Sequence, residues 1–425
     1  MKNLQKLLTT DWIKLEHQTA QLLQKQEEHG WYFNECAAWE LTQTLQERFR
    51  ETEELLRDKY PHVGGSLFTP KRANRTQGYI AGATFTRLKE LNTTSRDHIA
   101  WILRTHTSWK PESLTATGKP IIDETVLKDI GSPVALMFLS QLETIKKLGM
   151  LSQGVNAWLK LCTSASRIHH HCSVGAVTHR ATHRKPNLAQ VPSDSEFRRL
   201  FTATPGQFMV GADLSGIELR MLSHYLARYD SGRYANILIN GDIHQVNADQ
   251  IGISRSQVKT ITYCYLYGGS DKKIGFSYDK QLSQSEATRK GKEIREAYVN
   301  AIPGLKKLTT NVKEASKRGY IKAIDGRRIT VDSPHKALNS LLQGSAAVIA
   351  KRWMVINQQH VDELKLCATQ LAFIHDELQF ECSEEHTKDL CSSLVLSAAE
   401  TGEYYNLRCP IAAEAVGGRT WADTH

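Results

Sequence analysis

The chain has 425 residues, 40% of them hydrophobic, which is enough for two or three packed units. Lysine and arginine total 54 against 45 acidic residues; the net charge of +9 favours a polyanionic partner such as nucleic acid without requiring one. The eight cysteines show no CxxC pair and no metal-ligand spacing with histidine, which predicts a reducing compartment. The absence of a signal core and of any 18-residue apolar stretch argues against a membrane span and predicts an intracellular, cytoplasmic protein.

The first 160 residues read mainly as helix. Residues 11–58 have apolar positions at three- and four-residue spacing, which predicts two helices interrupted near Gly30 and Asn34. Residues 60–94 are rich in Gly, Pro and Thr and carry several cations, so an ordered loop or an inserted module is expected there. Helical patterning returns over 95–106 and 133–161. Long helices beside a basic loop suggest a lever-like arm.

The remainder alternates short strands with helices. Residues 165–207 are turn-rich and basic, and "FMVGADL" at 208–214 reads as a buried strand that breaks into a helix. Helix predominates to about residue 317. A hairpin is expected around Asp325-Gly326, a long helix over 335–364, and a strand–turn–strand over 369–386. These elements predict a helix-rich α+β fold.

Two carboxylates fall where predicted strands end. Asp213 closes the strand 208–214, and Asp376 lies in "FIHDELQF", at the join between two apolar strands. Mg²⁺ prefers oxygen ligands, and two ions can clamp the attacking and leaving oxygens of a phosphoryl transfer. The alternative for the second stretch, taken alone, is an ordinary His-Asp turn.

A cationic and aromatic stripe follows at 254–269. Arg255, Lys259 and Tyr263 recur every fourth residue, so they share one helix face over roughly 12 Å, about the reach from a terminal phosphate to a base. Tyr267 continues the stripe before Gly268-Gly269 ends the helix. The alternative is a solvated basic face with tyrosines packed beneath it.

Two further stretches suit nucleic acid without demanding it. "GAVTHRATHRKPNLAQVP" at 175–192 carries Arg180, Arg184 and Lys185, which could follow a phosphate backbone or a minor groove or form an ordinary basic loop. Asn339 and Gln343 lie four residues apart on one helix face, where amides cap, pack, meet solvent or read base edges.

In this order the stretches resemble family A DNA polymerases, most closely the replicative enzymes of podophages. "DLSGIELR", "RSQVKTITYCYLYGG", "HDE", "THRATHRKPNLAQVP", "GYIKAIDGRR" and "GGRTWADTH" match in place, and the likeness covers residues from about 11 to the end. It implies a right-hand fold of palm, fingers and thumb, the palm being an antiparallel sheet. The implied subdomains are an N-terminal palm-base helix (1–30), the thumb (31–164, with a basic insertion at about 60–94), a first palm segment (165–245), the fingers (246–335) and a second palm segment (336–425).

The resemblance implies template-directed extension of a primer 3′-OH by deoxynucleotides. Asp213 and Asp376 would bind two Mg²⁺ ions, for which Mn²⁺ could substitute, with the carbonyl of Leu214 as a further ligand. Lys259 would also protonate the pyrophosphate leaving group. The residues expected to contact the incoming nucleotide are Arg255, Lys259, Tyr263, His244, Glu218 and Tyr267. Those expected on the primer–template are Arg180, Gln190, Asn339, Gln343, His375 and Glu377.

Glu218 has two interpretations. Ser215-x-x-Glu218 fits a capping box at a helix start. The family instead implies a gate that hydrogen-bonds Tyr263 and excludes a ribose 2′-OH. Tyrosine at 263, where relatives often carry phenylalanine, implies weak discrimination against a missing 3′-OH.

The resemblance has departures. Only about ten residues precede the match, so no proofreading 3′–5′ exonuclease domain is expected, and segment 60–94 looks too short to bind thioredoxin firmly as a processivity factor. His179 and Cys264 stand where glycine is usual. Primer–template DNA, dNTPs and a replicative helicase–primase are the expected partners, in the host cytoplasm if the chain is phage-encoded. A non-catalytic DNA-binding protein and a single-subunit RNA polymerase are the alternatives.

Overall fold

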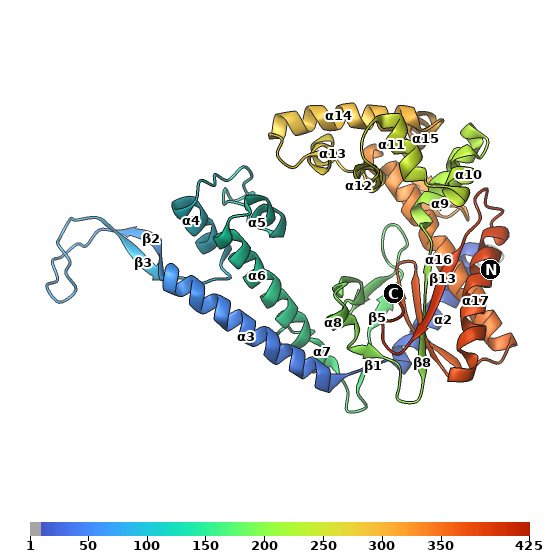
Figure 1. The fold of residues 1–425 in the computed structure, drawn as a ribbon, viewed down its shortest axis with the longest axis horizontal. Coiled ribbons are helices and arrows are strands. Elements are labelled where there is room, and N and C mark those ends of the chain that lie inside the picture. The colour runs from blue at the N-terminus through green and yellow to red at the C-terminus, as the bar shows by residue number, and fades with distance from the viewer. Residues whose placement is uncertain (1–9) are drawn as a thin grey trace, which may run out of the picture. The chain divides into compact units, whose positions relative to one another are not determined.

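The computed structural model describes residues 10–425, which form two compact units (Figure 1). The smaller unit is Glu35–Lys160, and the larger joins the chain up to Asn34 with Leu161–His425. Residues 1–9, which begin the predicted segment 1–30, lie outside the described residues. The helix-rich α+β class is confirmed, since long helices accompany antiparallel sheets. The subdomain boundaries inferred from the sequence stay predictions.

The smaller unit is built on helices that enclose their own core. Leu56, Ile99, Ile102 and Phe138 are fully buried in it, each on a helix face of three- and four-residue spacing. Its helices are α3 (Glu35–Lys59), α4 (Arg96–His106), α5 (Glu124–Ile130), α6 (Pro133–Leu148), a π turn (Gly149–Gln153) and α7 (Trp158–Leu161), which crosses the unit boundary. The break predicted near Gly30 and Asn34 is confirmed: α2 (Asp11–His29) ends before Gly30, at φ 71°, and α3 begins at Glu35.

Segment 60–94 is an ordered hairpin. Strands β2 (His62–Phe68) and β3 (Phe85–Glu90) pair antiparallel, and residues 69–84 join them. Phe68, Tyr79 and Phe85 pack ring to ring, and the Arg87 guanidinium lies 3.6 Å from the Phe68 ring centre. The loop therefore has a local aromatic core, while β3 is exposed along its whole length.

The core sheet of the larger unit has the order β11-β12-β8-β13, all antiparallel. Its strands are β8 (Phe208–Leu214), β11 (Ala368–Ile374), β12 (Glu377–Cys382) and β13 (Ala413–Gly418). Helix α17 (Thr387–Tyr404) packs against β8 and β13, and α2 packs against β11. Because β8 and β12 are covered, nearly all their residues are buried, which explains the continuous apolar runs in the sequence.

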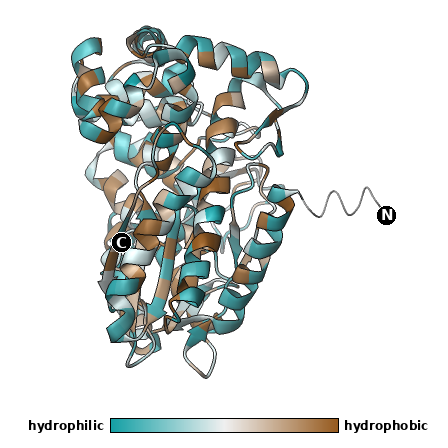
Figure 2. Cartoon of the chain, turned by 90° about the vertical axis from the view of Figure 1, so that its right-hand side faces the viewer, coloured by the Kyte–Doolittle hydropathy of each residue, from teal (hydrophilic) through white to brown (hydrophobic). Residues whose placement is uncertain are grey.

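Helices form the rest of the larger unit. The 27-residue α16 (Ala337–Glu363) has 18 buried residues and touches α2, α9 and α17. In Figure 2 the helices carry both teal and brown residues along their length, as expected where one face is buried. The other helices are α8 (Ser195–Arg198), α9 (Ile217–Asp230), α10 (Arg233–Asn240), α11 (Ile243–Ile251), α12 (Arg255–Leu266), α13 (Asp271–Tyr278), α14 (Gln284–Ala301) and α15 (Leu305–Ser316), with 3-10 turns at Leu188–Gln190, Pro334–Lys336 and Glu384–His386.

Small sheets complete this unit. The hairpin predicted at Asp325-Gly326 is confirmed as β9 (Tyr320–Lys322) and β10 (Arg328–Thr330). The others pair β1 (Trp31–Phe33) with β4 (Arg167–Ile168) and β7 (Phe201–Thr202), and β5 (His171–Ser173) with β6 (Thr182–Arg184). Within residues 10–425, no helix is long and apolar enough to cross a membrane.

Candidate active site

The core sheet brings Asp213 and Asp376 together. Asp213 is the penultimate residue of β8 and is in register with Glu377 of β12, so Asp376 in the preceding turn lies beside it. The backbone N–H of Leu214 donates to the carbonyl of Asp376 at 3.1 Å, which fixes the turn against the strand end. His375, with φ 60°, makes the tight reversal between β11 and β12.

The electrostatics of this pair favour a cation. Partial burial and the charge of Asp376 raise the pKa of Asp213 to about 7, and burial and the charge of Glu218 raise the pKa of Asp376 to about 6. Within residues 10–425 no Lys or Arg forms an ion pair with either carboxylate. The pair therefore carries repulsion that a bound cation would relieve.

Glu377, the register partner of Asp213, already has its hydrogen bonds. Its carboxylate accepts from Trp421 Nε1 at 2.6 Å, Gln379 Nε2 at 2.8 Å and His425 Nδ1 at 3.0 Å. It is buried, and despite that burial these donors keep its pKa below the ordinary value. The resemblance implied that Glu377 contacts the primer–template. In the structure Glu377 instead holds Trp421 and His425 against the sheet.

The capping box predicted at Ser215 is wrong. Helix α9 begins at Ile217, and its N-cap is Gly216 in the left-handed region (φ 57°) with no side-chain cap. The strand therefore turns into the helix through a glycine, since that backbone geometry suits a residue without Cβ. Glu218 is left free of a capping role at the start of α9.

Glu218 joins three elements, and its tyrosine partner differs from the one predicted. Its carboxylate accepts from Tyr267 Oη at 2.9 Å and from Arg180 at 2.7 Å; Tyr263, the predicted partner, forms no such bond. The partner is therefore the residue that caps the C-terminus of α12, one turn beyond Tyr263. Tyr263 stacks beside Tyr267, with ring centres 6.4 Å apart and an interplanar angle of 21°.

Helix α12 carries the predicted stripe, and its first residue, Arg255, bonds to Asp242, which was not predicted. It starts with a complete capping box between Ser254 and Gln257. Arg255 in the first turn donates from Nε to Asp242 at 2.5 Å, and Asp242 also caps α11 by accepting two backbone N–H bonds. Sequence reasoning missed Asp242, although an N-cap aspartate before a helix was readable in "GDIH". No carboxylate within residues 10–425 pairs with Lys259, which is exposed.

His244 lies between this helix and the start of α11. Its ring is 6.3 Å from that of Tyr263, it is buried, and burial lowers its pKa below the ordinary value. Within residues 10–425 its Nδ1 is buried and has no hydrogen-bond partner. An unpartnered imidazole nitrogen can accept or donate one hydrogen bond if a turn of the ring brings it to a ligand.

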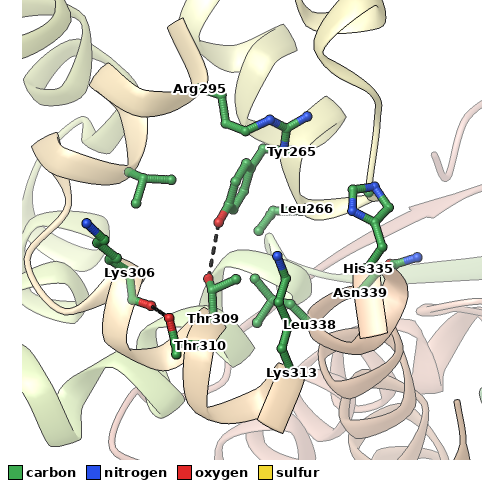
Figure 3. Close-up of a pocket in the computed structure, with 12 residues that line it drawn as sticks. Tyr265, Leu266, Arg295, Lys306, Thr309, Thr310, Lys313, His335, Leu338 and Asn339 are labelled. Atoms are coloured by element: carbon green, nitrogen blue, oxygen red, sulfur yellow. Dashed lines mark hydrogen bonds between the residues drawn. The ribbon is translucent and has the colours of Figure 1, made fainter. Parts of the chain in front are cut away.

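A cavity of about 220 Å³ opens behind α12 (Figure 3). Tyr265 crosses it and bonds to Thr309 at 3.1 Å, and Asn339, one of the two predicted amides, is on its wall. Gln343 lies one turn further along α16 and is partly buried. Half of the polar lining residues are basic, and they come from α14, from α15 and from the turn before α16, so the sequence does not bring them together: Arg295, Lys306, Lys313 and His335.

The basic loop delivers Arg180 to Glu218 and leaves Gln190 exposed on a 3-10 turn. His179 has φ 60° and bonds through Nε2 to the carbonyl of Arg328, so it holds the backbone geometry that glycine would favour. Cys264 is buried in the core of the larger unit. Both departures from the glycine pattern are therefore accommodated.

Comparison with known proteins supplies the family. The family model for DNA polymerase family A matches residues 71–423. The DNA-directed DNA polymerases of Enterobacteria phage T3 and Escherichia phage T7 are each 31% identical, over 98% of this chain and 71% of theirs. The polymerase domain of Pol1 from M. smegmatis, solved in complex with DNA primer-template and dNTP, superposes with a TM-score of 0.78 at 22% identity, over 96% of this chain and 70% of that one, which confirms the predicted polymerase fold. The chain belongs to DNA polymerase family A.

Proposed function

We propose that this protein extends a DNA primer on a DNA template with deoxynucleoside triphosphates, using two divalent cations. The observation that carries the proposal is the carboxylate pair Asp213–Asp376, set within one unit beside a helix that carries Arg255 and Lys259. Burial raises the pKa of Tyr263, and the charges of Glu218 and Asp376 add to the shift, which supports a position of that tyrosine within electrostatic reach of the pair. Carboxylates on one side and cations on the other suit a metal-bound triphosphate.

The donor set fits Mg²⁺. Two adjacent carboxylates with raised pKa values and no basic ion-pair partner within residues 10–425 form a hard, anionic oxygen site. Asp213, Asp376 and the carbonyl of Leu214 would hold the ions. When bound, the ions polarise the reacting phosphate and stabilise the attacking and leaving oxygens.

The protein's own residues bind and orient the nucleotide. Arg255, once it exchanges Asp242 for phosphate oxygens, and Lys259 bind the triphosphate by charge-assisted hydrogen bonds. Lys259 carries the proton that the leaving pyrophosphate needs. His244 Nδ1 is buried and unpartnered within residues 10–425, so a turn of the ring would be needed to bring it to a phosphate oxygen. Tyr263 packs on the nucleotide sugar, and Tyr267 lies next to the template base.

Glu218 acts as the sugar gate in this proposal, held by Arg180 and Tyr267. Two charge-assisted bonds fix its carboxylate, so a ribose 2′-OH would have to displace an ordered group. This rigidity supports selection for deoxynucleotides and argues against the RNA polymerase alternative.

The DNA side of the site draws on basic and amide groups. Arg180, Gln190, Asn339 and Gln343 would follow the primer–template, with His375 near the primer terminus. The solved relative is itself a complex with DNA primer-template and dNTP. Residues 61–89 of the hairpin carry five cations, and Glu90, which ends β3, is the one acid of the two strands and their loop. This excess of positive charge favours duplex phosphate over a protein factor such as thioredoxin. A helicase–primase partner stays a prediction.

Primer extension tests the proposal. Asp213→Asn and Asp376→Asn should each abolish Mg²⁺-dependent extension while primer–template affinity, measured by fluorescence anisotropy, changes less than about threefold. Glu384→Gln, an exposed carboxylate of the same unit, is the matched control. Substantial extension by either aspartate variant would overturn the metal assignment, and preference for ribonucleotides would favour an RNA polymerase.

A non-catalytic DNA-binding protein predicts binding without extension by the unmodified chain. A long template, with and without thioredoxin, scored for product length, also measures the processivity of the chain alone. Longer products with thioredoxin would contradict the role proposed for hairpin 61–89. A mismatched primer terminus that is trimmed before extension would contradict the expected lack of proofreading.

A further inference from the structure

A cluster of nitrogen and sulfur donors lies outside the carboxylate site, at the β5–β6 hairpin. Cys172 of β5 and His183 of β6 are register partners in the antiparallel pair, so their side chains leave the hairpin on the same face. His170 precedes Cys172 by two residues and shares that face. His169 and His171 point the other way, where their Nδ1 atoms bond to the carbonyl and the carboxylate of Glu27.

The three inward side chains are buried and close together. Their exposed fractions are 0% for His170, 7% for Cys172 and 8% for His183. One donor atom from each lies within 4.8 Å of the others, and Cys172 Sγ is 3.2 Å from His183 Nδ1. Zinc–ligand bonds of about 2.0–2.3 Å put tetrahedral donors roughly 3.5 Å apart, so the cluster needs a contraction of about 1.3 Å at most.

Each imidazole presents one nitrogen to the cluster. His170 Nε2 lies 2.9 Å from the Gln26 amide nitrogen, and His183 Nδ1 lies 3.2 Å from Cys172 Sγ. Within residues 10–425 the other nitrogens, His170 Nδ1 and His183 Nε2, have no hydrogen-bond partner, so nothing on the far side of either ring competes for its orientation. A neutral imidazole has one ring nitrogen with a lone pair, and in both rings the nitrogen that faces the cluster can supply it to a metal.

The side-chain amide of Gln26, on α2, lies beside His170 and Cys172 and can supply a fourth ligand atom. Its side-chain amide lies 2.9 Å from His170 Nε2 and 3.5 Å from Cys172 Sγ through the atom assigned as Nε2. A half-turn of the amide puts the oxygen there instead. If Gln370, its hydrogen-bond partner, turns with it, the bond between the two amides is kept and the otherwise unpartnered Gln370 Oε1 gains a donor.

We propose that His170, Cys172, His183 and the amide oxygen of Gln26 form a tetrahedral Zn²⁺ site that ties the β5–β6 hairpin to α2. As the sulfur–zinc bond forms, the Cys172 thiol loses its proton to solvent, and two imidazoles and one thiolate leave a single positive charge. Residue spacing alone does not reveal this site, because two of the donors pair across a hairpin and the third is one strand repeat away.

The site would set the base of the loop that carries Arg180. That loop connects β5 to β6, and the ring of His183 lies 6.4 Å from the ring of His375, edge to face. Zinc would thus hold the loop of Arg180 and the ring of His375 in place without contacting the reacting atoms. Its role is structural and independent of the proposed polymerase activity.

Metal binding by the full chain tests the proposal. An Asp213→Asn/Asp376→Asn background removes the carboxylate site, and Co²⁺ is titrated as the spectroscopic probe. We expect thiolate-to-cobalt charge-transfer absorption that saturates at about one equivalent per chain and is displaced by Zn²⁺. Cys172→Ser should abolish that absorption. Cys382→Ser, which removes another buried thiol of the same unit, should keep it.

Measurements on the unsubstituted chain guard against a variant that does not fold. Zinc should be retained at about one equivalent per chain after dialysis, should raise the Tm, and should protect Cys172 from alkylation during brief heating. Cobalt spectra without the thiolate band, or zinc that dialyses away and leaves the Tm and the alkylation of Cys172 unchanged, would overturn the proposal.

Discussion

Replacing Glu16 with glutamine should destabilise the larger unit strongly, because the buried ammonium group of Lys351 would lose its carboxylate partner. Glu16 of α2 accepts two hydrogen bonds of 2.8 Å from Lys351 Nζ on α16 and also bonds Arg327. The Lys351 side chain is completely buried, and Glu16 is its only carboxylate partner within residues 10–425. Arg327 keeps a second partner, Asp325, at 2.7 Å.

The expected cost follows from that difference. Breaking a buried pair by removing one partner costs about 3–5 kcal/mol, and a unit of this size loses about 2–4 °C of Tm per kcal/mol, giving roughly 6–20 °C. Removing both charges with Glu16→Gln/Lys351→Met should recover most of the loss. Glu28→Gln on the exposed face of α2 should change stability by less than about 0.5 kcal/mol.

Calorimetry of the full chain suits the measurement, because two compact units can give two transitions. Burial acts to raise the pKa of Glu16, but Lys351 and Arg327 bring it below its ordinary value. The stabilisation is therefore present above the ordinary glutamate pKa and is lost as the pH falls through the lower value of the folded state. A cost below about 1 kcal/mol, or a double variant no more stable than Glu16→Gln, would refute the reasoning.

The remaining predictions concern the active site. Arg255→Ala should raise the KM for dNTP at least about tenfold while primer–template affinity changes less than about threefold; equal losses in both would contradict its triphosphate role. Tyr263→Phe should reduce dideoxynucleotide incorporation relative to deoxynucleotide, and an unchanged ratio in single-nucleotide assays would count against its place beside the sugar. Because protons stay on Asp213 up to about pH 7 and on Asp376 up to about pH 6, the Mg²⁺ concentration for half-maximal activity should rise steeply from pH 8 to pH 6; a flat profile would exclude proton–metal competition at this pair.

Local chemistry made some of the site predictable. Asp213 and Asp376 stood at the ends of apolar strands, and the four-residue spacing of Arg255, Lys259 and Tyr263 fixed a shared helix face before any tertiary structure was known. Both inferences need only the repeat of one element. The hairpin at Asp325-Gly326 and the long helix after it were readable for the same reason.

Contacts between elements were not predictable in this way. Glu218 bonds Tyr267 instead of Tyr263, and a single sequence does not display which of two tyrosines on one helix face reaches a residue of another helix. The capping box at Ser215 failed because Gly216 entered the left-handed region and moved the helix start. The buried ion pair of Lys351 was not predictable from its apolar helix, because its acidic partner Glu16 is 335 residues away in the sequence.

The bonds that hold Glu377 matter to anyone who handles the protein at the bench. Trp421, Thr424 and His425 all bond to side chains of β12, and that strand sets the position of Asp213. An affinity tag or a fluorescent fusion attached after His425 would lie next to residues that bond to the sheet with both carboxylates. Removing Thr424 and His425 would remove two of the hydrogen bonds to β12. Labels and surface anchors therefore belong on exposed positions away from these last residues and from the basic hairpin, such as Glu28 on α2.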